Sequence, residues 1–199
     1  MRVNVVKPAN NSGLPSAKYG YLYVAQADDV VTFPGVDESG VVTVGNIVLR
    51  EGSKFTLLYL TPSKQKVNTD TTGELESRGF NQKIAGSYPG DEIQINAFVN
   101  DLLNEPLILV SEICGQPYRK ILGTPWNPMY FSTNFKDDST DKLWELDFEK
   151  AFPDETPALF YNGIIEVDAP AEPDVPAGSG GEVIYTGSGG GFIDLTQDF

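Results

Sequence analysis

The chain has 199 residues, of which 28 are Asp or Glu and 14 are Lys or Arg, so its formal net charge is −14. This balance argues against tight, direct binding to nucleic-acid phosphates, which relies on Lys and Arg. The chain contains no histidine. A Ser-His-Asp or Cys-His catalytic site and a histidine metal ligand are therefore excluded within it.

Hydrophobic residues make up 40% of the chain, which is enough for a sizeable core. Cys114 is the single cysteine, so no intrachain disulfide can form. No stretch approaches the roughly 20 apolar residues of a membrane helix, and residues 1–13 lack the apolar run of a signal peptide. We therefore expect no membrane contact and synthesis in a cytoplasm.

Residues 1–17 are polar and rich in turn formers, which predicts an N-terminal arm. A β-rich core domain is expected over residues 18–163. Its first half contains stretches rich in Val, Tyr, Leu and Phe that predict strands. These are Tyr19–Ala27, Val30–Phe33, Val41–Leu49, Lys54–Leu60 and Gly79–Ile84, with residues 41–60 forming a hairpin.

A polar stretch, Thr61–Ser77, interrupts this series and is predicted to be a long loop. It is rich in Thr, Ser, Lys and Glu and has little apolar content. Loops of this length inside a compact domain are usually functional or mobile.

The best-patterned stretch runs from Gly86 to Thr124. A turn at Ser87–Gly90 precedes a helix near residues 91–104, which Asp91 can cap and which Pro106 terminates. Five apolar residues share one face of this helix, namely Ile95, Phe98, Val99, Leu102 and Leu103. The apolar stretch Leu107–Ile113 predicts a buried strand, and Tyr118–Thr124 predicts its return strand.

Three further strands are predicted after this stretch. Leu143–Glu149 alternates most regularly, with Trp144, Leu146 and Phe148 on one face and acidic residues on the other, which indicates a half-buried antiparallel strand. The others are Met129–Phe135 and Ala158–Tyr161.

Residues 164–199 contain no Lys or Arg and are rich in Pro and then in Gly, which predicts an acidic C-terminal arm. Two short apolar groups interrupt this linker composition. They are candidate anchors that dock on another surface or add a strand to a sheet edge: Val183, Ile184 and Tyr185, and then Phe192, Ile193 and Leu195.

The acidic and glycine-rich groups of the chain do not form a recognisable catalytic, cofactor or metal site. The pair Asp28-Asp29 and the group Asp137, Asp138 and Asp141 lack the spacing of an EF-hand loop. The glycines of the C-terminal arm lack the lysine of a P-loop and the strand–helix context of a dinucleotide site. We therefore expect no enzyme activity and no cofactor.

The order of elements resembles the tail tube proteins of long-tailed bacteriophages. The shared features are several strands, one central helix, several more strands, and irregular arms at both ends, over roughly Val41–Tyr161. The turn, helix and apolar strand of Gly86–Thr124 add to the resemblance.

The resemblance implies a β-sandwich or barrel whose copies form rings, commonly hexameric, stacked into a hollow tube in the virion tail. Strands around Val41–Leu60 and Gly79–Ile84 would line the lumen, and DNA would pass without specific binding. The loop Thr61–Ser77 would contact the next ring, with Lys64, Lys66, Asp70, Glu74 and Glu76 as candidate residues. Both arms would clasp neighbouring copies or other tail or neck proteins, after synthesis in the host cytoplasm.

Other functions stay open at this point. The chain could be a phage neck, tail terminator or baseplate component. It could instead be a binding module for sugar or protein, with Trp126, Tyr130 and the group Tyr19, Tyr21 and Tyr23 as exposed stacking residues. A histidine-free enzyme would use carboxylates such as Glu74 and Glu76 or the pair Asp137 and Asp138.

Overall fold

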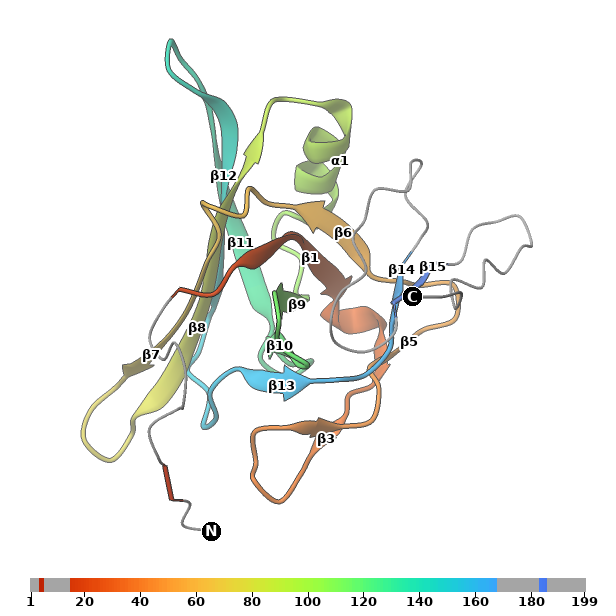
Figure 1. Cartoon of the computed structure of the whole chain (residues 1–199), viewed down its shortest axis with the longest axis vertical. Coiled ribbons are helices and arrows are strands. Elements are labelled where there is room, and N and C mark those ends of the chain that lie inside the picture. The colour runs from red at the N-terminus through yellow and green to blue at the C-terminus, as the bar shows by residue number, and fades with distance from the viewer. Residues whose placement is uncertain (1–3, 6–14, 168–182, 186–199) are drawn as a thin grey trace.

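The computed structural model describes residues 4–5 and 15–167, and the backbone of residues 183–185. The protein is mainly β, with a nine-stranded antiparallel sheet, three two-stranded pairs and one α-helix in these residues (Figure 1). The strands are β1 (Lys18–Gln26), β2 (Val30–Thr32), β3 (Gly35–Val36), β4 (Thr43–Val44), β5 (Val48–Leu49), β6 (Thr56–Tyr59), β7 (Lys66–Thr72), β8 (Gly79–Pro89), β9 (Leu107–Ile113), β10 (Arg119–Leu122), β11 (Met129–Asp137), β12 (Lys142–Lys150), β13 (Leu159–Tyr161), β14 (Ile165–Val167) and β15 (Val183–Tyr185).

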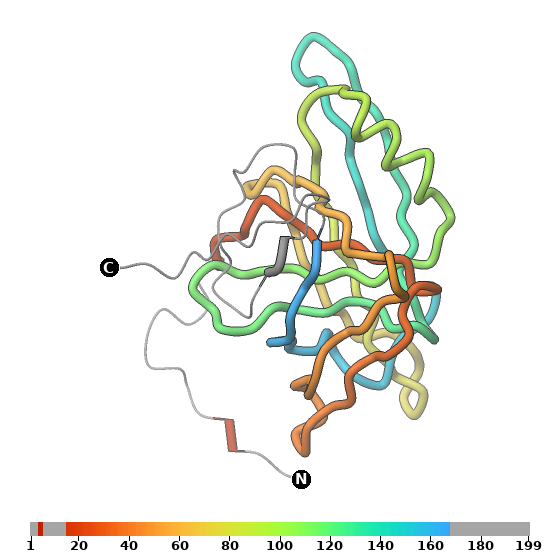
Figure 2. Tube along the Cα trace, turned by 90° about the vertical axis from the view of Figure 1, so that its right-hand side faces the viewer, coloured from red at the N-terminus to blue at the C-terminus, as the bar shows by residue number. Residues whose placement is uncertain are grey.

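The large sheet consists of two parts. Strands β11, β12, β8 and β7 form what we call the long sheet, and strands β6, β1, β9, β10 and β13 form the cross sheet. The pair Met129–Leu107 is the one strand pairing between them. Figure 2 shows the β9–β10 hairpin running across the view, while the β11–β12 hairpin runs along the molecule's length.

The main hydrophobic core lies between these two parts. Alternation along the strands supplies its residues, since every second side chain of a strand points to the same face. Leu22, Leu109 and Leu122 enter it from the cross sheet, and Ile84 and Phe148 enter it from the long sheet. The predicted inward face of Leu143–Glu149 is confirmed, because Leu146 and Phe148 are buried and Trp144 packs against the same core.

The opposite face of the cross sheet carries a second hydrophobic cluster. Segments from residues 27–55 and β14 cover it, with Ile47, Phe55, Ile165 and Val167 buried. Beside this cluster the buried guanidinium of Arg119 donates to the Glu112 carboxylate at 2.5 Å and to the Gly163 carbonyl at 3.1 Å. The packed body thus runs to Val167, past the predicted boundary at residue 163.

Helix α1 (Ile93–Leu102) covers one side of the main core. The predicted apolar face is confirmed for Ile95, Phe98, Val99 and Leu102, which contact the core. The prediction that Leu103 belongs to this face is wrong, because the helix ends at Leu102 and the Leu103 side chain is 44% exposed. No helix among the described residues is long and apolar enough to cross a membrane.

Asp91 does not cap this helix. Glu92 occupies the N-cap position without a side-chain cap, and the Asp91 carboxylate instead accepts hydrogen bonds from the Asn96 amide and the Trp144 indole. The predicted turn at Ser87–Gly90 is largely strand, because β8 continues to Pro89 while it pairs with β12.

Two predictions on the first half of the chain are wrong. Residues 41–60 do not form a hairpin, because β5 pairs with β2 and β6 pairs with β1. Residues 61–77 are not one loop, because β7 pairs with β8 over seven residues. The β-branched Thr residues and Val67 of β7 favour extended backbone, although the stretch as a whole is polar.

The C-terminal anchor residues lie only partly within the described residues. Val183–Tyr185 form β15, which runs parallel to β14 with Val183 opposite Ile165. Phe192, Ile193 and Leu195 lie outside the described residues, as does most of the predicted N-terminal arm.

Candidate assembly surfaces

Both outer strands of the long sheet have an open backbone edge. Strand β7 pairs only with β8 among the residues that the structure describes, and residues 130–137 of β11 pair only with β12. Each edge therefore presents unpaired N–H and C=O groups, which are a template for pairing with another chain. Six of the seven β7 residues are exposed.

The face of the long sheet that points away from the core is polar. It carries Glu145, Asp147 and Glu149 along β12, with Lys83 of β8 on one side and Lys136 of β11 on the other. The Lys83 ammonium lies 3.6 Å from Asp147 and 3.9 Å from Glu149, and the Lys136 ammonium lies 2.5 Å from Glu145. Such exposed pairs add little stability, but they largely balance the charge of this face.

Two of these groups have shifted pKa values. The hydrogen bond from Lys136 lowers the pKa of Glu145, and the same bond raises the pKa of Lys136. Both groups therefore stay charged around neutral pH, and this face keeps its ion pair.

The predicted inter-ring residues lie on β7 and in the turns before and after it, and all five are exposed. Lys64 lies in the turn before β7, Lys66 and Asp70 lie on β7 itself, and Glu74 and Glu76 lie in the turn between β7 and β8. They are thus spread along an open strand edge and do not form one loop. Lys64 lies at the opposite end of β7 from Glu74 and Glu76.

The long sheet has two distinct ends. At the end we call the turn end lie the β7–β8 turn (residues 73–78), the turn at residues 124–127 and the loop at residues 151–157, because Gly79, Met129 and Lys150 begin or end their strands there. At the end we call the helix end lie the β11–β12 turn and the start of α1. Figure 1 shows the β7–β8 turn and the β11–β12 turn at opposite extremes of the molecule.

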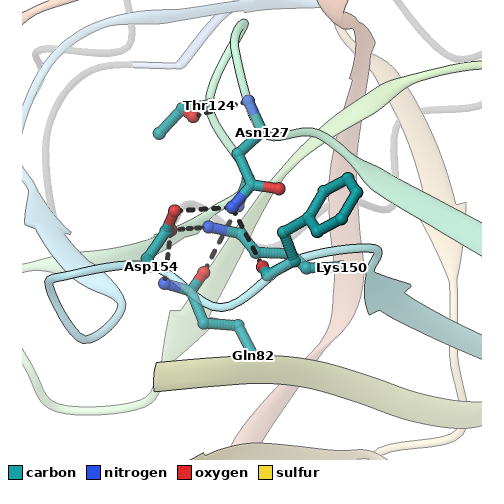
Figure 3. A network of polar contacts seen from close by, with 7 residues as sticks. Gln82, Thr124, Asn127, Lys150 and Asp154 are labelled. Atoms are coloured by element: carbon teal, nitrogen blue, oxygen red, sulfur yellow. Dashed lines mark hydrogen bonds and ion pairs between the residues drawn. The ribbon is translucent and has the colours of Figure 1, made fainter. Parts of the chain in front are cut away.

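A network of polar side chains holds the turns at the turn end (Figure 3). The Asn127 amide donates to the Asp154 carboxylate at 2.6 Å and to the Phe152 carbonyl at 3.0 Å. The Lys150 ammonium forms an ion pair with the same carboxylate, and the Gln82 amide donates to it at 3.4 Å. Asp154 also exchanges backbone hydrogen bonds with Phe80. One carboxylate thus links three segments of the chain.

Burial changes the pKa of the lysine in this network. The Lys150 side chain is fully buried, and burial lowers the pKa of its ammonium to about 8. A buried charge is retained only where it is paired and hydrogen-bonded, which the Asp154 carboxylate provides.

Gly123 allows the chain to leave β10 for the turn at 124–127. Its φ is +84°, and a Cβ atom at this position would lie 2.9 Å from the Leu107 carbonyl oxygen, which together exclude most other residues. Thr124 and Asn127 then exchange two backbone hydrogen bonds of 3.1 Å. This turn is therefore fixed at both of its ends.

The remaining candidate residues do not gather into a site. Tyr23 is buried in the second cluster, so it is not an exposed stacking residue, whereas Trp126 and Tyr130 are exposed. Asp28 and Asp29 lie in a short 3-10 helix where Asp29 pairs with Arg50 at 3.6 Å. The described residues hold no group of three potential metal ligands.

Sequence reasoning missed the network around Asp154. The prolines at positions 125, 128, 153 and 157 are typical of turns, and they indicate that the chain turns at both places. No local pattern indicated that Lys150 and Gln82 would meet there, since they come from separate strands. Comparisons of the chain with protein-family models, with curated proteins and with solved structures found no match.

Proposed function

We propose that this protein is a structural subunit of a tailed bacteriophage virion, a tail tube protein whose copies join into a ring around a DNA conduit. The observation that carries the proposal is the pair of open backbone edges, β7 and residues 130–137 of β11, at the two sides of one continuous long sheet. In this proposal the long sheet and the cross sheet, which pack on the main core, would form the β-sandwich of the tube subunit.

The two edges differ, so pairing β7 of one copy with β11 of the next makes a head-to-tail contact. Head-to-tail contacts produce rings when the rotation between copies closes. A closed ring also removes every edge of the long sheet, which protects the subunit from uncontrolled strand pairing.

The polar face of the long sheet fits the lumen of such a ring. Its three β12 carboxylates outnumber Lys83 and Lys136, which pair with those carboxylates, so the excess of negative charge among these residues repels phosphates. Because nucleic-acid affinity depends on cation–phosphate contacts, DNA would pass along this face without being held. The other face of the long sheet carries apolar residues and packs against the main core of the subunit.

The pairing of β15 with β14 shows that part of the C-terminal arm can add a strand to a packed body, here that of its own chain. It places Val183–Tyr185 beside a strand of the packed body as an added strand. We propose that the arms contact neighbouring copies and other tail or neck proteins.

Proline substitutions along β7 test the ring contact. Asn68 and Thr69 are adjacent, so the N–H group of one points toward β8 and that of the other points to the open edge. The test therefore uses both Asn68→Pro and Thr69→Pro. Whichever of them removes the N–H group at the open edge should abolish rings and leave the melting temperature nearly unchanged. The variant that removes the N–H group facing β8 should lower the melting temperature, because it breaks the β7–β8 ladder.

Electron microscopy and sedimentation velocity of the purified protein and of both variants give the readout. Rings from the wild-type chain that neither variant alters would contradict pairing through β7. A wild-type chain that stays monomeric at all concentrations would contradict the structural role. Single rings that never stack would favour a neck or terminator component over the tube.

A further inference from the structure

The turn end of the long sheet carries three unusually exposed apolar side chains. Leu75 is 74% exposed, Trp126 is 74% exposed and Phe152 is 72% exposed. They come from the β7–β8 turn, the turn at 124–127 and the loop at 151–157. The three turns are neighbours, because the loop at 151–157 bonds to Phe80 through the Asp154 backbone and to Asn127 through the Phe152 carbonyl. Exposed apolar residues gathered at one end of a fold often mark an interaction surface, and we call these three residues the apolar cap.

Two members of the apolar cap are held in fixed positions. The Asn127 side chain joins the turn of Trp126 to the backbone of Phe152 and to Asp154. The Trp126 ring also packs edge-on against Phe33, with 5.4 Å between ring centroids. Aromatic residues on such rigid supports bind with little loss of conformational entropy.

The helix end carries its own exposed apolar residue. Ile93, in the first turn of α1, is 86% exposed. Strand pairing fixes its location relative to the apolar cap, because Pro89 lies opposite Leu143 at one end of the long sheet and Met129 lies opposite Lys150 at the other.

We infer that the apolar cap is the stacking surface between rings, and that it contacts the helix end, including Ile93, of a second copy in the next ring. This inference rests on the proposed ring. In a ring built through β7 and β11, all apolar caps lie on one ring face and all Ile93 side chains lie on the other. One kind of contact between unlike faces propagates into a tube, whereas contact between apolar caps alone stops at two rings.

Charge substitutions at the two ends test the inference. Trp126→Asp and Ile93→Asp each alter an exposed side chain, so the melting temperature should stay within a few degrees of the wild-type value. Each variant should still form rings but lose tubes. Tyr118→Ala, at an exposed aromatic residue near Phe160, is the matched control and should form tubes like the wild type.

Mixing the two variants identifies the contact partner. Rings of Trp126→Asp have an intact helix end, and rings of Ile93→Asp have an intact apolar cap. The mixture should therefore form two-ring stacks, which neither variant forms alone. Electron microscopy counts these stacks, and a mixture that contains only single rings would overturn the pairing of these two surfaces.

Two outcomes separate this inference from the proposed function. If the wild type forms no rings, the proposed function fails and the stacking contact fails with it. If the wild type forms tubes and Trp126→Asp also forms them, only the stacking inference is overturned. A wild type that forms rings without tubes overturns the stacking inference as well and leaves the ring in place.

Discussion

At the residue scale, Asp154 has the largest structural role that sequence reasoning did not find. Its carboxylate accepts hydrogen bonds from Asn127 and Gln82 and pairs with buried Lys150. Removing one partner from a buried ion pair leaves an uncompensated charge, which typically costs about 3–5 kcal/mol. We expect Asp154→Ala to destabilise the protein by an amount in this range, and chemical denaturation measures it.

The isosteric change Asp154→Asn is the control for this prediction. It keeps the shape of the side chain and removes the charge that Lys150 requires. A loss of stability as large as that of Asp154→Ala would attribute the effect to the ion pair. A variant as stable as the wild type would contradict a structural role for the pair.

The lowered pKa of Lys150 also leads us to expect a pH dependence of stability. Burial lowers the pKa of its ammonium in the folded state to about 8, whereas an unfolded chain has a lysine pKa of about 10.4. Between these two values the unfolded state binds more protons, so this residue's contribution to stability rises with pH. The free-energy difference between the wild type and Lys150→Met, measured from pH 7 to pH 10, should shift in favour of the wild type. A flat difference would contradict the lowered pKa.

At the element scale, the residues that α1 and β9 contribute to the core are buried to different degrees. Leu109 of β9 is fully buried, while Phe98 of α1 is only partly buried and packs 5.9 Å from the Phe131 ring. Leu109→Ala should therefore cost about 2–5 kcal/mol of folding free energy, and Phe98→Ala should cost less than a fully buried Phe. Denaturant unfolding of both variants checks this order. Assembly should fail only where folding fails, and a stable variant that does not assemble would make this region an interface.

Periodicity predicted the elements whose side chains divide cleanly between core and solvent. The helix face with Ile95 and Phe98, the buried strand Leu107–Ile113 and the alternation around Trp144 are examples. Strand β7 was missed because Val67 is its one residue that packs against the core. The partners of β5 and β6 were also missed, because between them the chain passes from the segments that cover the cross sheet into the cross sheet itself, so these neighbouring strands do not pair with each other.

The candidate surfaces were less predictable than the elements. Whether a strand edge is open depends on which other strands lie beside it. No local pattern in residues 66–72 or 130–137 therefore indicates an open edge. The turn end likewise joins three turns that are up to about 80 positions apart in the chain, and strand register alone brings them together. Trp126 was predicted to be an exposed stacking residue, but the exposure of Leu75 and Phe152 at the same end of the sheet was not predicted.

At the scale of the whole molecule, a net charge of −14 acts on any assembly. Copies of an acidic protein repel one another, and salt screens this repulsion over about 10 Å at 0.1 M ionic strength and about 3 Å at 1 M. In the proposed assembly, ring closure would gain a row of backbone hydrogen bonds, whereas stacking through the apolar cap would rely on apolar burial between acidic ends. The two steps of assembly should therefore respond to salt differently.

Both ends of the long sheet carry acidic residues beside their apolar ones. Glu74 and Glu76 flank Leu75 at the turn end, and Glu92 precedes Ile93 at the helix end, where Asp138 lies in the β11–β12 turn. Hydrogen bonds from the Asp141 and Thr140 backbone lower the pKa of Asp138, so this carboxylate stays ionised at neutral pH. The proposed stacking would thus bring like charges together around an apolar contact.

Raising NaCl from 0.1 M to 1 M should therefore increase the fraction of rings that stack into tubes, because screening weakens repulsion while apolar burial persists. The double variant Glu74→Gln/Glu76→Gln should stack at 0.1 M to the extent that the wild type reaches only at higher salt. The double variant Glu51→Gln/Asp101→Asn makes the same change in net charge at exposed positions away from the turn end, and it should retain the wild-type salt dependence. Sedimentation velocity resolves rings from tubes across the salt series. Tubes that dissociate as salt rises would show that ionic contacts hold the rings together, and the apolar cap would then not be the contact that joins them.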